Sequence, residues 1–115
     1  MYNLLVITGD LNLNVKFEYS SKKYADTKEF SRADRLIEIA KRNHAKTYIN
    51  AMGGKELYNK VYFANQGIDL KLIKGSSVEY KQFYNEFIPY LSIIDVMMFN
   101  SPERIREILD DYELE

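Results

Sequence analysis

The 115-residue sequence has no cysteine, no tryptophan, two prolines and one histidine. The absence of cysteine excludes disulfides, thiolate metal sites and cysteine nucleophiles. With His44 as the only histidine, a zinc site is not expected, so we predict no metal, and no motif identifies a cofactor. No apolar run reaches the length of about 18 residues that indicates a transmembrane helix. The N-terminus also lacks the pattern of a signal peptide, and together these absences predict a cytoplasmic protein without membrane insertion.

The length and charge narrow the class of protein further. A chain of 115 residues is long enough to bury one core, so we expect a single α/β domain over residues 1–115. The net charge is −1 at pH 7. A nucleic-acid-binding domain usually has a strongly basic face, so we expect no nucleic-acid partner.

Three segments have the pattern of strands, and two helical segments separate them. The strands are expected at 15–19, 46–50 and 68–73, and the helices at 31–44 and 55–66. This alternation predicts a three-stranded parallel sheet, and right-handed crossovers predict the strand order 3-2-1. Helices are then needed on both faces of the sheet.

The remaining segments are less regular. Residues 2–8 predict a short N-terminal helix, with a strand over 4–8 as the alternative. Residues 20–30 read as a surface loop, and the long connection 75–89 is typical of a functional loop. Two helices, one over 92–99 and one starting after Ser101, form a C-terminal pair.

The two central helices have local signals for their ends and their buried faces. Ser31 is expected to cap the first of them, and an apolar stripe should face the core. The stripe consists of Ala33, Leu36, Ile37 and Ala40. In the second helix the residues expected to face inward are Leu57, Val61 and Ala64. Gly67 is well placed to end that helix in the left-handed conformation.

A glycine-rich turn follows the second predicted strand. Gly53, Gly54 and Lys55 combine open backbone, the start of a predicted helix and a positive charge, which favours binding of an anion. The alternative is a tight turn whose glycines need a positive φ. Turns after the other predicted strands would add more lysines to the same edge of the sheet, namely Lys22, Lys23 and Lys74. An anionic small molecule, such as phosphate, a nucleotide-sugar or an acyl donor, is therefore the expected partner.

Asp95 is the one carboxylate that stands among apolar residues. A buried carboxylate needs partners, and a raised pKa would make it a general base or a substrate anchor. The alternative is that Asp95 caps its own helix together with Ser92.

Several short segments, taken in order over residues 15–109, resemble the second half of the WbqC-like family. They are 31–36, 48–50, Gly53 to Lys55, 57–58, Phe63, 67–68, Tyr80 with Gln82, 91–95, 99–100 and 102–103. Family members are longer and begin with a His-Gln-Pro-Asn-Tyr-like motif that this sequence lacks. The resemblance thus implies that residues 1–115 correspond to part of a longer family domain.

The resemblance implies a role in the biosynthesis of a bacterial surface polysaccharide of the O-antigen type. The implied activity is transfer of an acyl, aminoacyl or glycosyl group. Asp95, from its apolar surroundings, is the expected catalytic residue. The expected ligand-binding residues are Asn50, Gly53, Gly54, Lys55, Arg32, Arg35 and Tyr58. The alternative is a non-enzymatic module for interaction or homo-oligomerisation, or an inactive fragment.

Overall fold

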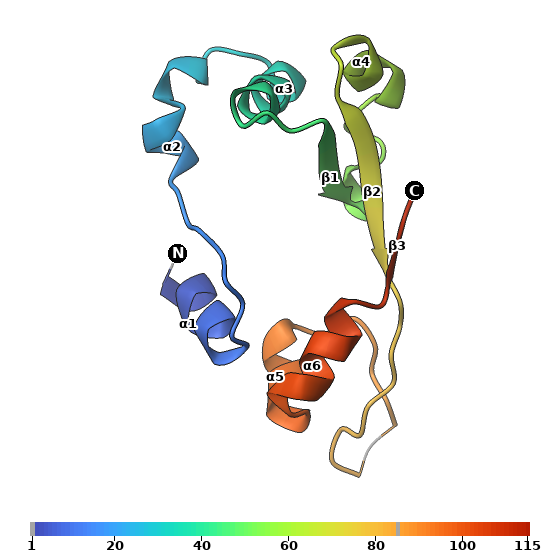
Figure 1. Ribbon diagram of the computed structural model, residues 1–115. Helices are drawn as coiled ribbons and strands as arrows, with labels where there is room; N and C mark the ends of the chain where they lie inside the picture. The colour runs from blue at the N-terminus through green and yellow to red at the C-terminus, as the bar shows by residue number, and fades with distance from the viewer. Residues whose placement is uncertain (1, 85) are drawn as a thin grey trace. The chain divides into compact units, whose positions relative to one another are not determined.

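The computed structural model describes residues 2–84 and 86–115, which form two compact units (Figure 1). Unit 1 contains the described residues of Met1–Lys16 and Gly75–Tyr112. Unit 2 contains Phe17–Lys74 and Glu113–Glu115. The expected single domain over residues 1–115 stays a prediction.

The sheet has three strands in the order β1-β2-β3, which are Thr47–Ala51, Asp69–Gly75 and Tyr112–Leu114. β1 and β2 are parallel, with Tyr48 opposite Leu70, which confirms the predicted second and third strands. β3 runs antiparallel to β2, because Leu72 and Glu115 exchange two backbone hydrogen bonds of 2.9 Å. The sheet is therefore mixed, and the prediction of an all-parallel sheet with order 3-2-1 is wrong.

The predicted sheet includes a strand at 15–19 that is absent and lacks the strand at 112–114, and both errors have physical causes. Residues 15–19 alternate apolar and polar side chains but form no strand. Val15 and Tyr19 are half exposed, so the alternation buries no face against a core. At the other end of the chain, Asp110 and Asp111 follow the last helix, where the helix dipole disfavours negative charge. The chain leaves the helix there, and the alternating segment 112–114 pairs with β2.

The core of unit 2 forms where α3 (Arg32–Arg42) and α4 (Lys60–Asn65) meet the sheet. Ser31 Oγ accepts a hydrogen bond of 3.2 Å from the Asp34 N–H, which confirms the predicted cap. Ile37 and Ala40 are buried and Ala33 and Leu36 pack partly against them, so the predicted stripe is also confirmed. The buried core cluster consists of Ile37, Ala40, Phe63, Ile68 and Leu70.

α4 begins five residues later than predicted, because Asn59 caps it by accepting a hydrogen bond from the Tyr62 N–H. The later start changes which face is buried. Phe63 is 0% exposed, whereas Val61 is 67% exposed and Leu57 is 63% exposed, so the predicted inward face is wrong. Gly67 has a φ of 80°, which confirms the predicted helix end.

Only one face of the β1–β2 pair is covered within unit 2. Tyr48 and Leu70 point into the core with α3 and α4. Side chains alternate along a strand, so Ile49 and Ile73 lie on the opposite face, and both are exposed. The predicted helices on both faces are thus not found within unit 2.

The segment predicted as a loop over 20–30 contains two short helices, α2 (Ser20–Lys23) and the 3₁₀ helix η1 (Ala25–Thr27). Thr27 is fully buried and its hydroxyl accepts a hydrogen bond of 3.1 Å from Arg35 Nε. Arg42 donates two hydrogen bonds, of 3.0 and 2.6 Å, to the carboxylate of Asp26 and thereby lowers the pKa of that group. These contacts fasten the segment to α3.

Unit 1 contains α1 (Tyr2–Asp10), α5 (Ile93–Phe99) and α6 (Pro102–Leu109). The predicted N-terminal helix is confirmed, and the alternative strand is not. Ser92 caps α5 and Ser101 caps α6, each through a hydrogen bond of 3.3 Å, so the predicted C-terminal pair is confirmed. α3, with 11 residues, is the longest helix described, and none in the described residues has the length and apolarity to cross a bilayer.

The core assignment predicts a large difference between two substitutions on α4. Phe63→Ala should destabilise the protein by about 3–5 kcal/mol, because the ring is fully buried, stacks with Tyr48 and meets Tyr58 edge to face. Val61→Ala, on the exposed face of the same helix, should change the free energy of unfolding by less than about 0.5 kcal/mol. Urea unfolding followed by circular dichroism measures both, and equal effects would contradict the assignment.

Candidate functional site

The carboxylate of Asp95 is held from the connection that precedes α5. The Tyr80 hydroxyl donates a hydrogen bond of 2.6 Å to Asp95 Oδ2, and Gln82 Nε2 donates one of 3.0 Å to the same oxygen. Asp95 does not use its carboxylate as a helix cap, since Ser92 Oγ caps α5 by accepting from the Ile94 N–H. The alternative interpretation of Asp95 as a cap is therefore wrong.

Gln82 organises the segment that surrounds the carboxylate. Its side chain is only 7% exposed. Gln82 Oε1 accepts a hydrogen bond of 2.8 Å from the Ile88 N–H, and Nε2 donates one of 3.1 Å to the Ile88 carbonyl. These two hydrogen bonds tie the Gln82 side chain to the backbone of Ile88, as paired bonds join two strands. Two residues of the segment, Phe83 and Tyr90, have positive φ values of 49° and 59°, which is rare for bulky side chains.

The Tyr80 ring packs against other aromatic rings. The Tyr80 ring lies with its centroid 5.2 Å from that of Phe87 and 6.5 Å from that of Phe99. Phe83 meets Phe99 edge to face at 4.7 Å. Such contacts limit the rings to defined positions.

A small cavity lies beside these residues. Its volume is about 150 Å³, and the residues that line it are Gln82, Phe83, Glu86, Ile88, Leu91, Asp95 and Phe99. Among the described residues, hydrogen bonds to the Asp95 carboxylate are made to Oδ2 and none is made to Oδ1. No buried side-chain oxygen in the described residues lacks a partner, so Oδ1 is open to solvent. Asp95 also lines the cavity, and Oδ1 is the oxygen of its carboxylate that is left for a further donor.

The hydrogen bond to Asp95 raises the pKa of the Tyr80 hydroxyl above its ordinary value, and burial adds to the effect. Tyr80 is consequently a protonated donor throughout the physiological pH range. Its hydroxyl fixes the orientation of the Asp95 carboxylate.

The glycine turn has a different conformation from the one predicted. Residues Met52–Gly54 form the 3₁₀ helix η2 directly after β1, and α4 starts only at Lys60, so the turn does not open that helix. Among the glycines of the described residues, positive φ occurs at Gly67 and not in this turn. A Cβ at Gly54 would lie 2.3 Å from Asn50 Nδ2, so a larger residue there would require the Asn50 side chain to move. The closest ring atom of Tyr58 would be 3.6 Å from the same Cβ.

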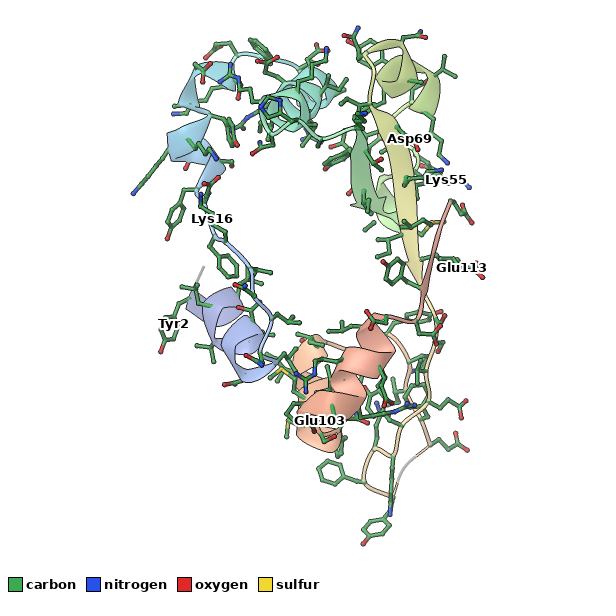
Figure 2. The ribbon with its side chains drawn as sticks, viewed as in Figure 1. Tyr2, Lys16, Lys55, Asp69, Glu103 and Glu113 are labelled. Atoms are coloured by element: carbon green, nitrogen blue, oxygen red, sulfur yellow. The ribbon has the colours of Figure 1, made fainter. Side chains whose placement is uncertain are left out.

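Of the cationic residues expected to bind a ligand, Lys55 and Arg35 have contacts within unit 2. Lys55 Nζ lies 3.7 Å from the carboxylate of Glu115, and both side chains are largely exposed (Lys55 is labelled in Figure 2). Arg35 donates to the buried Thr27 hydroxyl, which gives it a role in the fold. Arg32 is exposed at the first position of α3.

The structure brings together some of the predicted site residues. Asn50 and Tyr58 both lie beside Gly54, with Gly53 and Lys55 in the same turn. Asp95 belongs to unit 1, and the seven predicted ligand-binding residues belong to unit 2. Within the part of the chain that the structure describes, no group of three or more His, Cys, Asp or Glu side chains is arranged to hold a metal ion.

Sequence reasoning assigned no role to Tyr80, Gln82 or Glu86. Tyr80 and Gln82 are among the residues that resemble the family, and their spacing of two residues places both on one side of an extended chain. Their link to Asp95 spans 13 to 15 residues of irregular chain, which no periodic pattern identifies.

The raised pKa of Tyr80 predicts a specific alkaline dependence of stability. The unfolded tyrosine loses its proton near pH 10, about its ordinary pKa, while folded Tyr80 still holds its proton. The stabilisation is therefore complete below about pH 10 and declines as the pH rises through the folded pKa. Tyr80→Phe should show a shallower alkaline decline than wild type in urea unfolding at increasing pH. Tyr84→Phe, which removes an almost fully exposed phenol, should behave like wild type. Identical slopes for all three proteins would contradict the assignment.

Comparison with known proteins gives one match. The model of the WbqC-like protein family matches residues 1–107, which is most of the chain and includes Tyr80, Gln82 and Asp95. No curated protein and no solved structure matches. The chain belongs to the WbqC-like protein family.

Proposed function

We propose that the chain acts in the assembly of a bacterial surface polysaccharide of the O-antigen type, as a cytoplasmic transferase whose acceptor binds in the Asp95 cavity. The family membership supports the pathway. The observation that carries the proposal is the state of the Asp95 carboxylate. Oδ2 is held by Tyr80 and Gln82, Oδ1 accepts no hydrogen bond from the described residues, and Asp95 lines the cavity.

In the proposed reaction Asp95 is the general base. An acceptor O–H or N–H group gives its proton to Oδ1 of Asp95 while its oxygen or nitrogen bonds to the electrophilic carbon of an activated acyl, aminoacyl or glycosyl donor. The bond from that carbon to the leaving group of the donor breaks, and the leaving group departs with the electron pair. Tyr80 and Gln82 keep the base in one orientation, which is what proximity catalysis requires.

The cavity is suited to part of an acceptor. Ligand pockets usually measure about 300–1,000 Å³, so a volume of about 150 Å³ accommodates one reacting group and its immediate surroundings. A whole nucleotide-sugar does not fit in it. Glu86 and Asp95 are the charged residues that line the cavity, so an anion is disfavoured there.

We propose that an anionic small molecule binds instead at the turn in unit 2. The ligand-binding roles of Asn50, Gly53, Gly54, Lys55, Arg32, Arg35 and Tyr58 are part of this proposal. What supports it is the 64% exposed side chain of Lys55 and the open space beside Gly53. The anion would replace the carboxylate of Glu115 as the partner of Lys55.

A thermal-shift screen tests both binding sites. The ligands are neutral sugars and amino sugars, as acceptor candidates, and phosphate, nucleotides, nucleotide-sugars and coenzyme A, as anions. A ligand at 100 times its dissociation constant stabilises by about 2.7 kcal/mol, a rise in melting temperature of several degrees. Asp95→Asn should lose the shift with acceptor sugars and keep the shift with anions. Lys55→Ala should weaken binding of the anions by about two- to fivefold, because the charge is exposed.

The two variants serve as controls for each other, since each alters one unit only. Circular dichroism of each variant without ligand checks that the substitution leaves the fold intact. A sugar-induced shift that persists in Asp95→Asn would contradict the acceptor site. An anion-induced shift that is unchanged in Lys55→Ala would contradict the site in unit 2.

Self-association is a second candidate function, because α1 exposes several large apolar side chains. Tyr2 is 77% exposed and Leu4 is 55% exposed (Tyr2 is labelled in Figure 2). Within unit 1 a groove of about 440 Å³ lies between α1 and α5. Its lining is mainly apolar, consisting of Tyr2, Asn3, Val6, Ile7, Asp10, Ile94, Met97 and Met98. Exposed apolar surface of this kind favours contact with another chain.

Light scattering over a range of protein concentrations tests this candidate. If α1 mediates self-association, the mass of wild type should rise with concentration, and Leu4→Asp should keep the protein monomeric. Glu103→Lys, a change of charge on the exposed side of α6, is the control and should leave the mass unchanged. A monomeric wild type at the highest concentration would rule this function out.

A further inference from the structure

β1 is an end strand of the sheet, and within the described residues β2 is its only neighbour (Figure 1). The Asp69 N–H donates a hydrogen bond of 2.8 Å to the Lys46 carbonyl, and Thr47 lies opposite Asp69. In a parallel pair with this register, the backbone groups of Thr47, Ile49 and Ala51 point away from β2. They form the outer edge of the sheet, and such a row of N–H and C=O groups can pair with a further strand.

Little in β1 prevents a further strand from joining this edge. Asn50 Oδ1 accepts a hydrogen bond of 2.9 Å from the Ala51 N–H, which occupies one outward donor. Within the part of the chain that the structure describes, the outward N–H and C=O groups of Thr47 and Ile49 make no hydrogen bond. The strand Thr47–Ala51 contains no proline and no charged residue, which are common means of protecting an exposed edge.

The segment 15–19 has the complementary properties. Val15, Phe17 and Tyr19 alternate with two charged residues, as in a strand with one apolar face. The segment nevertheless belongs to no helix or strand, and Val15 and Tyr19 are half exposed. Its five residues equal the length of β1. It thus has the pattern of a strand but no strand beside it.

We propose that the segment 15–19 of one chain pairs with the outer edge of β1 in a second copy of this chain, and that the exchange is reciprocal. Each chain carries one such edge and one such segment. Two chains related by a two-fold axis therefore satisfy both edges and both segments, and the assembly closes as a dimer.

The exchange also suits the side chains of the two strands. When Phe17 lies opposite Ile49, the apolar side chains of 15–19 are on the same face of the sheet as Ile49. That is the face on which Ile49 and Ile73 are exposed, so the added strand covers part of both apolar surfaces. The contact uses neither the Asp95 cavity nor α1, and it is independent of the functions proposed above.

Because the chain has no cysteine, a disulfide between two engineered cysteines reports the contact directly. Chains carrying Phe17→Cys and chains carrying Ile49→Cys are mixed in equal amounts and oxidised. Paired strands lie about 4.8 Å apart, which is within the reach of a disulfide. The mixture should give about tenfold more linked pairs of unlike chains than a mixture of Phe17→Cys with Val61→Cys, a control at an exposed position of α4.

Ile49→Pro tests the edge without a disulfide. Proline removes the N–H of residue 49, which points away from β2, so the pairing of β1 with β2 is kept. Light scattering should give a dimer for wild type and a monomer for Ile49→Pro, with the circular dichroism of wild type. If Ile49→Pro is unfolded, the cross-link decides alone. Leu4→Asp should stay dimeric, which distinguishes this contact from self-association through α1.

Four results would overturn the proposal. Wild type could be monomeric at the highest concentration, or a folded Ile49→Pro could remain dimeric. Ile49→Cys chains could link to each other as efficiently as to Phe17→Cys chains, which would show that β1 pairs with β1 of the second copy. A chain with both cysteines could close its disulfide internally, which would show that the segment and the edge pair within one chain.

Discussion

The carboxylate of Asp95 is the group on which the described connection between β2 and α5 depends. No helix or strand is assigned to the described residues of 76–91, so backbone ladders do not hold this stretch. The hydrogen bonds from Tyr80 and Gln82 to Asp95, and those between Gln82 and Ile88, take their place. Hydrogen bonds to a charged group contribute about 1.5–3 kcal/mol each, which is large for a segment without regular structure.

The same constraint gives the site its chemistry. Because both donors use Oδ2 of Asp95, Oδ1 remains open, and the carboxylate has one orientation. The closed segment also brings Glu86 and Phe83 to the rim of the cavity. A structural network and a candidate catalytic group are therefore one arrangement, which is why substitutions at Tyr80 are expected to alter both stability and the properties of the base.

The features that the sequence predicted correctly are local ones. The caps at Ser31, Ser92 and Ser101 and the helix end at Gly67 depend on contacts within a few residues, and all are present. The isolation of Asp95 among apolar residues also identified a carboxylate with unusual partners. These signals can be read from spacing alone.

The features that were missed depend on distant partners. The sheet includes 112–114 and not 15–19, because 112–114 pairs with the free edge of β2. Both segments alternate with a period of two, so the alternation does not show which of them pairs with β2. Similarly, the buried face of α4 follows from the cap at Asn59, which moves the start of the helix and turns Phe63 inward. Tyr80 and Gln82 reach Asp95 across a stretch without periodicity, so the residues were visible but their contact was not.

A double-mutant cycle between Tyr80 and Asp95 tests this account most directly. The free energy of unfolding is measured for wild type, Tyr80→Phe, Asp95→Ala and the double variant. The hydrogen bond of 2.6 Å predicts a coupling energy of about 1–2 kcal/mol, below the full value for charged pairs because Asp95 is only partly buried. Effects that add to within about 0.3 kcal/mol would show that the two groups do not interact, and the site built on Asp95 would lose its basis.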